Sequence, residues 1–201
     1  ADPPPGPEFF AAIVRDGDSV MMDTGTTTSV LARELLGRRG LTIVTNSSDV
    51  ARTLATVNGN KVYMAGGELH GDNGAAFGRS ACAFVADFKV RFAVISIAAV
   101  SAAGGLMDYH LDEAEFARIV LTCGERRLVL TDASKFDRTA LVRVAGFGLL
   151  GNRQLKRVLR EVRADRNAPV LNANYVEDAF LILRNRLVDD GYLDALVMAE
   201  L

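Results

Sequence analysis

Short apolar, β-branched runs alternate with segments of helical periodicity as far as about residue 131, and this alternation is the strongest constraint on the fold. Strands are predicted at residues 19–23, 41–45, 61–65, 91–98 and 127–131, and helices at 26–36, 49–57, 80–88 and 111–123. Strands that alternate with helices of this length form a parallel sheet with short crossover connections. We therefore expect an α/β fold, with an open and mostly parallel sheet flanked by helices.

The composition is that of a soluble globular protein, and it limits the partners that the chain favours. Hydrophobic residues make up 49% of the chain and charged residues 24%, which is enough apolar material for a core. The formal net charge of −2 argues against a general electrostatic hold on nucleic acid. No apolar run reaches the ~18 residues that span a bilayer. Cys82 and Cys123 have neither a CxxC spacing nor a neighbouring histidine, so two buried thiols are favoured over the alternative of a disulfide or a site. We expect no metal and no cofactor.

The character of the sequence changes near both ends, which divides the chain into three predicted parts. Residues 1–16 are a proline-rich lead, and a linker, a cloning remnant or the start of an exported protein would each explain it. Residues 17–147 carry the alternating pattern, and residues 148–201 form a C-terminal appendage. Helical patterns near 155–162 and 175–188, with a strand-like run at 192–198, predict that this appendage is helical or α+β.

The chemically unusual residues gather where the predicted strands end, which is where ligands bind in open parallel sheets. The first of these loops, Asp23-Thr24-Gly25-Thr26-Thr27-Thr28, opens a predicted helix. Gly25 permits a tight turn, and the threonines offer hydroxyls beside the amide groups of a helix N-terminus. This combination favours the binding of a phosphate. The plainer alternative is a helix N-cap with extra hydroxyls.

Three later loops carry polar side chains at the same predicted edge of the sheet. Thr45-Asn46-Ser47-Ser48 precedes a helix, where capping explains one residue and a polar pocket wall explains all of them. Gly66-Gly67-Glu68 is typical of an ordinary turn. Lys135 follows the last predicted strand, where its ammonium would either pair with a phosphate or lie on the surface.

Taken in order, these loops resemble the sensor domain of the DeoR family of sugar-metabolism regulators. The matching stretches are 23–28, 41–47, 66–69, 105–106, 113–115 and 132–136. The resemblance implies a fold similar to that of ribose-5-phosphate isomerase and the coenzyme A transferases. It also implies a cytoplasmic regulator in which a phosphorylated sugar or polyol alters the affinity of a repressor for DNA. Residues 95–100 and 105–109 look most similar to the glycerol-3-phosphate repressor branch of the family.

The resemblance further implies where the ligand would lie and how the protein would assemble. By position, the expected site residues are Gly25, Thr26, Thr27 and Thr28 for the phosphate, and Asp23, Asn46, Ser47, Glu68 and Lys135 for the rest of the lining. Regulators of this family generally work as homo-oligomers. The helical stripe of Phe116, Ile119 and Val120 would serve as an interface, although a stripe that faces the core is the favoured interpretation.

The sequence departs from the family pattern at three places. About 18 residues precede the first predicted strand, where the family carries a winged helix-turn-helix. We therefore expect that this chain lacks the DNA-reading part. DNA would be contacted only through a winged helix-turn-helix that is absent from this chain. Many members carry an acidic residue where this chain has Val100-Ser101-Ala102-Ala103, which leaves part of the pocket undefined. Beyond Phe147 the pattern is lost, and residues 178–201 loosely resemble a POTRA module of outer-membrane assembly proteins, so a fused chain is an alternative.

A sugar-phosphate isomerase of the related fold is the other alternative function. Isomerisation needs a general base placed against a carbon-bound proton of the substrate. Glu113 and Glu115 are i, i+2 neighbours on a predicted helix, so at most one faces the pocket and they form no evident catalytic pair. His70 and His110 are isolated and are expected to be surface or satisfied histidines. We therefore expect a sensor without catalytic residues.

Overall fold

The computed structural model describes residues 13–101, 103–131, 135 and 137–145. Most of the proline-rich lead and all of the appendage predicted at 148–201 lie outside the described residues, together with the helices and strand predicted there. Within the described part, no helix is long and apolar enough to cross a membrane.

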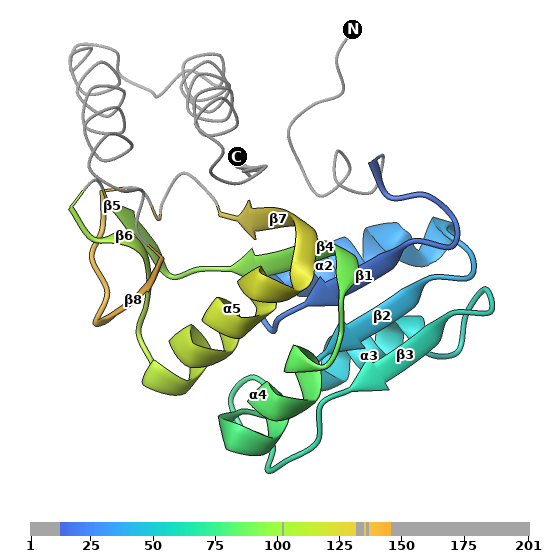
Figure 1. The fold of residues 1–201 in the computed structure, drawn as a ribbon, viewed down its shortest axis with the longest axis horizontal. Coiled ribbons are helices and arrows are strands. Elements are labelled where there is room, and N and C mark those ends of the chain that lie inside the picture. The colour runs from blue at the N-terminus through green and yellow to red at the C-terminus, as the bar shows by residue number, and fades with distance from the viewer. Residues whose placement is uncertain (1–12, 102, 132–134, 136, 146–201) are drawn as a thin grey trace, which may run out of the picture.

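A five-stranded parallel sheet forms the centre of the domain (Figure 1). Its strands are β1 (Ser19–Met22), β2 (Thr42–Thr45), β3 (Lys61–Met64), β4 (Val90–Ser96) and β7 (Gly124–Leu130). Their order is β3-β2-β1-β4-β7, so the chain proceeds outward from β1 and then returns to β4 on the other side of β1. Open α/β sheets bind ligands in the crevice at such a reversal of strand order, here between β1 and β4.

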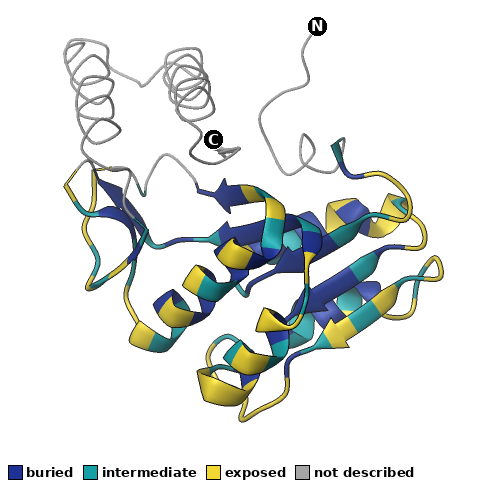
Figure 2. Ribbon diagram, viewed as in Figure 1, coloured by how far each residue is buried: buried dark blue, intermediate teal, exposed yellow. Residues whose placement is uncertain are grey.

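Helices cover both faces of this sheet (Figure 1). They are α2 (Thr26–Glu34), continued by the 3-10 turn η1 (Leu35–Gly37), α3 (Ser48–Leu54), α4 (Gly78–Ala86) and α5 (Leu111–Cys123). α2 and α3 cover one face, and α4 and α5 cover the other. Successive strand residues point to opposite faces, so Val20 and Met22 pack on the α2–α3 side and Met21 packs on the α4–α5 side. This two-sided burial makes the inner strands continuous apolar runs (Figure 2).

The predicted α/β class and the elements of the main sheet are confirmed, with small shifts at their ends. The strand predicted at 91–98 is β4, which begins one residue earlier and ends at Ser96. The helix predicted at 26–36 is α-helical as far as Glu34, and its last turn is the tighter 3-10 form. Helix ends commonly tighten in this way, which periodicity does not reveal.

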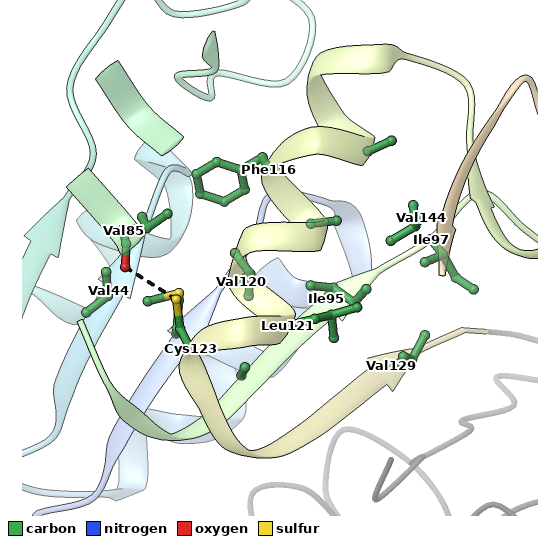
Figure 3. Packing of buried hydrophobic residues seen from close by; sticks show 14 of the residues in the cluster. Val44, Val85, Ile95, Ile97, Phe116, Val120, Leu121, Cys123, Val129 and Val144 are labelled. Carbon is green, nitrogen blue, oxygen red and sulfur yellow. Dashed lines mark hydrogen bonds between the residues drawn. The ribbon is translucent and has the colours of Figure 1, made fainter. Parts of the chain in front are cut away.

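The apolar stripe of α5 faces the core. Phe116 and Val120 are buried between α4 and the sheet (Figure 3). Ile119 is half-buried against the same cluster. The favoured interpretation of this stripe is therefore confirmed. Cys123 is a buried thiol in the cluster, 3.5 Å from the carbonyl oxygen of Val85, whereas the free thiol of Cys82 is only partly buried. The prediction of two buried thiols thus holds for Cys123 alone.

A second sheet, which the sequence reading does not anticipate, follows β4. It is antiparallel and contains β5 (Ala99–Ser101), β6 (Gly105–Asp108) and β8 (Val142–Ala145) in the order β5-β6-β8. These strands have only three or four residues, too few for an alternating pattern to stand out. Because β6 ends just before α5 begins, this small sheet brings Asp108 close to the first turn of that helix.

Candidate ligand-binding site

A cavity of about 280 Å³ lies at the carboxyl ends of β1 and β4, where the strand order reverses. Its lining is drawn from the loop after β1, the end of β4, the segment before α4, the end of β6, α5 and the segment after β7. The lining residues are Asp23, Thr24, Gly25, Thr26, Thr27, Asn73, Phe77, Ser96, Ile97, Ala98, Asp108, Glu113, Phe116 and Lys135. Of the nine predicted site residues, the structure brings Asp23, Gly25, Thr26, Thr27 and Lys135 together in this cavity.

The N-terminus of α2 opens into the cavity without a side-chain cap. Gly25 is the N-cap residue, so it has no side chain with which to bond the first amides of the helix. Thr26 and Thr27 line the cavity, whereas the hydroxyl of buried Thr28 donates to the carbonyl oxygen of Gly25 at 3.0 Å. The N-cap residue of α2 therefore supplies no side-chain cap, unlike the plainer N-cap alternative, and the described residues show no side-chain bond to the amides of its first turn.

Gly25 is required at this position by close packing. A Cβ atom there would lie 2.5 Å from the Oγ of Ser96, and the backbone φ of 156° is one that L side chains rarely adopt. The Ser96 hydroxyl is itself held in place, because it donates to the carbonyl oxygen of Thr24 at 3.1 Å. The loop after β1 is thus fitted closely to the end of β4.

Asp23 is a buried carboxyl group at the floor of the site, with 7% of its surface exposed. Its Oδ2 accepts a hydrogen bond from the backbone amide of Ser96 at 2.8 Å, and its Oδ1 has no hydrogen-bond partner among the described residues. Burial raises the pKa of Asp23 well above its ordinary value, and the nearby Asp108 and Glu113 raise it further. The charge of Lys135 acts in the opposite direction.

Asp108 and Glu113 form a coupled acid pair at another part of the wall. Their side chains share a hydrogen bond, and Glu113 also accepts one from the Nδ2 of Asn73 at 3.2 Å. Burial, followed by the charge of Asp108, raises the pKa of Glu113 to about 7. Burial likewise raises the pKa of Asp108. The two carboxyl groups therefore hold a proton between them near neutral pH.

Asn73 joins the loop between β3 and α4 to both ends of the cavity. The side chain of Asn73 donates to Glu113, and its backbone carbonyl oxygen accepts from the Thr24 hydroxyl at 3.5 Å. The aromatic rings of Phe77 and Phe116, which meet edge to face with centroids 6.1 Å apart, supply an apolar wall. A site with polar ends and an apolar wall is suited to a small polar metabolite with a carbon backbone.

Four of the predicted site residues do not line the cavity. Thr28 is turned into the helix, and Glu68 is exposed. Ser47 caps α3 by accepting from the amide of Val50 at 3.4 Å. Asn46 is fully buried, with its Nδ2 donating to the carbonyl oxygen of Ala76 at 3.0 Å. In this structure Ser47 and Asn46 hold neighbouring segments of backbone together.

Seven lining residues with polar or aromatic side chains are not among the predicted site residues: Thr24, Asn73, Phe77, Ser96, Asp108, Glu113 and Phe116. The sequence predicts that at most one of Glu113 and Glu115 faces the pocket, and the structure shows that this residue is Glu113, which bonds Asp108. A signal for Asp108 did exist, because an aspartate just before a predicted helix lies near the residues of its first turn. No such local signal marks Asn73, whose place depends on the path of a long loop.

Comparison with known proteins identifies the family. The model of the DeoR C terminal sensor domain matches residues 8–150. The glycerol-3-phosphate regulon repressor of Haemophilus influenzae is 35% identical over 134 residues, covering 67% of this chain and 52% of that protein. The repressor of the same name from Escherichia coli is 28% identical over 137 residues, covering 68% of this chain and 54% of that protein. The chain spans about half the length of these curated relatives.

A further repressor and a solved structure are also similar to this chain. The HTH-type transcriptional repressor CsqR of Escherichia coli is 33% identical over 137 residues, covering 68% of this chain and 52% of that protein. Ribose 5-phosphate isomerase A of Methanocaldococcus jannaschii aligns with 79% of this chain and 64% of its own, at 14% identity and a TM-score of 0.46. Because the family model spans well over half of the sequence, this chain belongs to the DeoR family through its C-terminal sensor domain.

Proposed function

We propose that this domain binds a phosphorylated sugar or polyol and thereby controls a repressor of carbohydrate metabolism. The observation that carries the proposal is the N-terminus of α2, which opens into the cavity with two threonines and without a side-chain cap. The amides and the positive end of the helix dipole at such a terminus favour an anion. The names of the relatives, which include glycerol-3-phosphate regulon repressors, support a short phosphorylated polyol as the first ligand to try.

The regulatory part of the proposal extends beyond this chain. We propose that residues 17–147 are the sensing unit of a cytoplasmic homo-oligomer that contacts DNA through a winged helix-turn-helix. The net charge of −2 favours a separate DNA-reading element, because this chain has no basic excess with which to hold a polyanion. To act as a switch, the ligand must bind two conformations of the regulator unequally. In this proposal, residues 148–201 form an appendage outside the sensing unit.

The acid pair gives one observation in favour of a second function, a sugar-phosphate isomerase. A glutamate whose pKa lies near 7 is suited to general base catalysis at neutral pH. The repressor names of the curated relatives favour the sensor over the enzyme. An aldose–ketose conversion assay separates the two functions, and the sensor predicts no turnover. Turnover that Glu113→Gln abolished would favour the enzyme.

A thermal-unfolding screen tests the proposed function. Glycerol 3-phosphate, glucitol 6-phosphate and ribose 5-phosphate would each be compared with the unphosphorylated parent compound. At least one phosphate ester should stabilise the protein, by about 2.7 kcal/mol at a concentration roughly 100 times its dissociation constant. The parent compounds should leave the melting temperature unchanged. Equal stabilisation by an ester and its parent would refute an anion-binding site.

A further inference from the structure

The cavity lining combines two chemically different groups of residues. One is the N-terminus of α2, where Thr26 and Thr27 are polar but uncharged. The other, which we call the acid end, consists of the carboxyl groups of Asp23, Asp108 and Glu113. These three groups affect one another electrostatically, since Asp108 and Glu113 both act on the ionisation of Asp23. Because both groups line the same cavity, a ligand whose anion lies at the N-terminus of α2 has its remaining groups beside these acids.

The acid end contains a buried carboxyl oxygen that lacks a hydrogen-bond partner among the described residues. Oδ1 of Asp23 is buried and has no partner among the described residues, although Oδ2 of the same group accepts from the Ser96 amide. A buried polar atom without a partner is costly, so a bound molecule that hydrogen-bonds to it gains affinity. A hydroxyl group suits both forms of the carboxyl group, because it donates to the ionised form and accepts from the protonated one.

We propose that the acid end recognises the hydroxyl-bearing end of a phosphorylated ligand and rejects ligands that carry a second anionic group there. This inference rests on the proposed function and deepens it from phosphate binding to a choice among phosphate esters. Of the described lining residues, Lys135 is the one cation, and it faces an excess of carboxyl groups. A ligand carboxylate at this end would meet like charges, which costs affinity.

Among the described residues, no group of three histidine, cysteine, aspartate or glutamate side chains is arranged to hold a metal ion. The carboxyl groups are instead engaged with neutral partners: the amides of Ser96 and Tyr109 and the side-chain amide of Asn73. Hydrogen bonding, rather than ion coordination, is therefore the chemistry that this end offers to a ligand.

Matched pairs of ligands test the inference by calorimetric titration at pH 8. Glucitol 6-phosphate and 6-phosphogluconate have the same chain length and differ in a terminal hydroxymethyl or carboxylate group, as do glycerol 3-phosphate and 3-phosphoglycerate. The 201-residue protein should bind the polyol phosphate of a pair at least about tenfold more tightly than the phosphocarboxylate. Glu113→Gln and Asp108→Asn should narrow that ratio. Glu115→Gln is the control, because Glu115 is exposed on the same helix outside the cavity and should leave the ratio unchanged.

A second measurement, on the unmodified protein, does not depend on how well a variant folds. Between pH 8 and pH 6 the acid pair gains a proton, so the repulsion of a ligand carboxylate weakens and the affinity ratio should narrow. The titration of the phosphate cancels because both ligands of a pair carry it. The charged or titratable groups that act on the pair are Asp23, His110, Asp112 and Lys135.

The possible outcomes separate this inference from the proposed function. Tight binding of the polyol phosphates with a ratio that narrows in Glu113→Gln and at pH 6 supports both. Equal affinities for the two ligands of each pair would overturn the inference alone. The same holds if the affinity ratio is as large in Glu113→Gln and Asp108→Asn as in the control Glu115→Gln. Failure of every phosphate ester to bind would overturn the proposed function, and the inference with it.

Discussion

The carboxyl group of Asp23 accepts a hydrogen bond from the backbone amide of Ser96 at 2.8 Å, across the point where the strand order of the sheet reverses. The bond ties the loop after β1 to the end of β4. A second hydrogen bond joins the same two segments, because the Ser96 hydroxyl donates to the carbonyl oxygen of Thr24. The backbone of the α2 N-terminus is therefore held in position before any ligand arrives, which reduces the cost of ordering it on binding.

Gly25→Ala should destabilise the domain and abolish ligand binding. The new Cβ would lie 2.5 Å from the Ser96 Oγ, at a φ of 156°. The backbone strain alone costs on the order of 1–3 kcal/mol. Urea unfolding measures the loss of stability, and calorimetry measures the loss of binding. Gly37→Ala is the control, because a Cβ at this glycine meets nothing within 4 Å. Similar losses in the two variants would contradict the close fit of Gly25 against Ser96.

Thr27→Glu should remove ligand binding while leaving the fold intact. The substitution places a negative charge where a phosphate would lie, and like charges repel. An acidic side chain near a helix N-terminus is tolerated or mildly favourable, so the melting temperature of the ligand-free protein should change little. Thr56→Glu, at an exposed turn position, is the matched control and should bind ligand normally. A Thr27→Glu protein that melts early yet still binds would make this threonine a packing residue.

Glu113 should make the stability of the ligand-free domain depend on pH. Its pKa is raised from 4.5 to about 7, so between these values the folded protein binds more protons than the unfolded chain. The free energy of unfolding therefore falls as pH rises through this window, and the contribution of Glu113 is fully present only below it. Urea unfolding from pH 5 to pH 8 should show a shallower fall for Glu113→Gln. Identical pH profiles for the two proteins would mean that the pair does not share a proton.

The parallel sheet was predictable because its signals are local. Buried strands such as 41–45 and 91–98 are continuous apolar runs, and helices of ordinary length separate them. The loop at 23–28 was recognisable for the same reason, since its glycine and threonines follow one strand and open one helix. A binding loop whose residues are adjacent in the sequence can therefore be recognised without a structure.

The acid end was predictable only in part, because its local pair is completed by residues from distant segments. Asp108 and Glu113 are close in the sequence, but the strand that ends at Asp108 is held by pairing with β8 more than thirty residues later. Asn73 reaches Glu113 from forty residues away. Conversely, Asn46 is a residue type that often occurs in binding sites, but its side chain is buried. Its amide donates to the carbonyl oxygen of Ala76. A polar residue at a strand end is equally suited to satisfying the backbone, and only the tertiary structure decides between the roles.

A crystal structure of the protein with the phosphate ester that stabilises it most would test the central claim most directly. We predict that the phosphate lies at the N-terminus of α2, with its oxygens about 2.7–3.2 Å from the backbone amides of Thr26 and Thr27. The remainder of the ligand should extend toward Asp23, Asp108 and Glu113. A phosphate bound elsewhere, for example between Arg79 and Arg118 in the groove between α4 and α5, with the N-terminus of α2 unoccupied, would contradict the account.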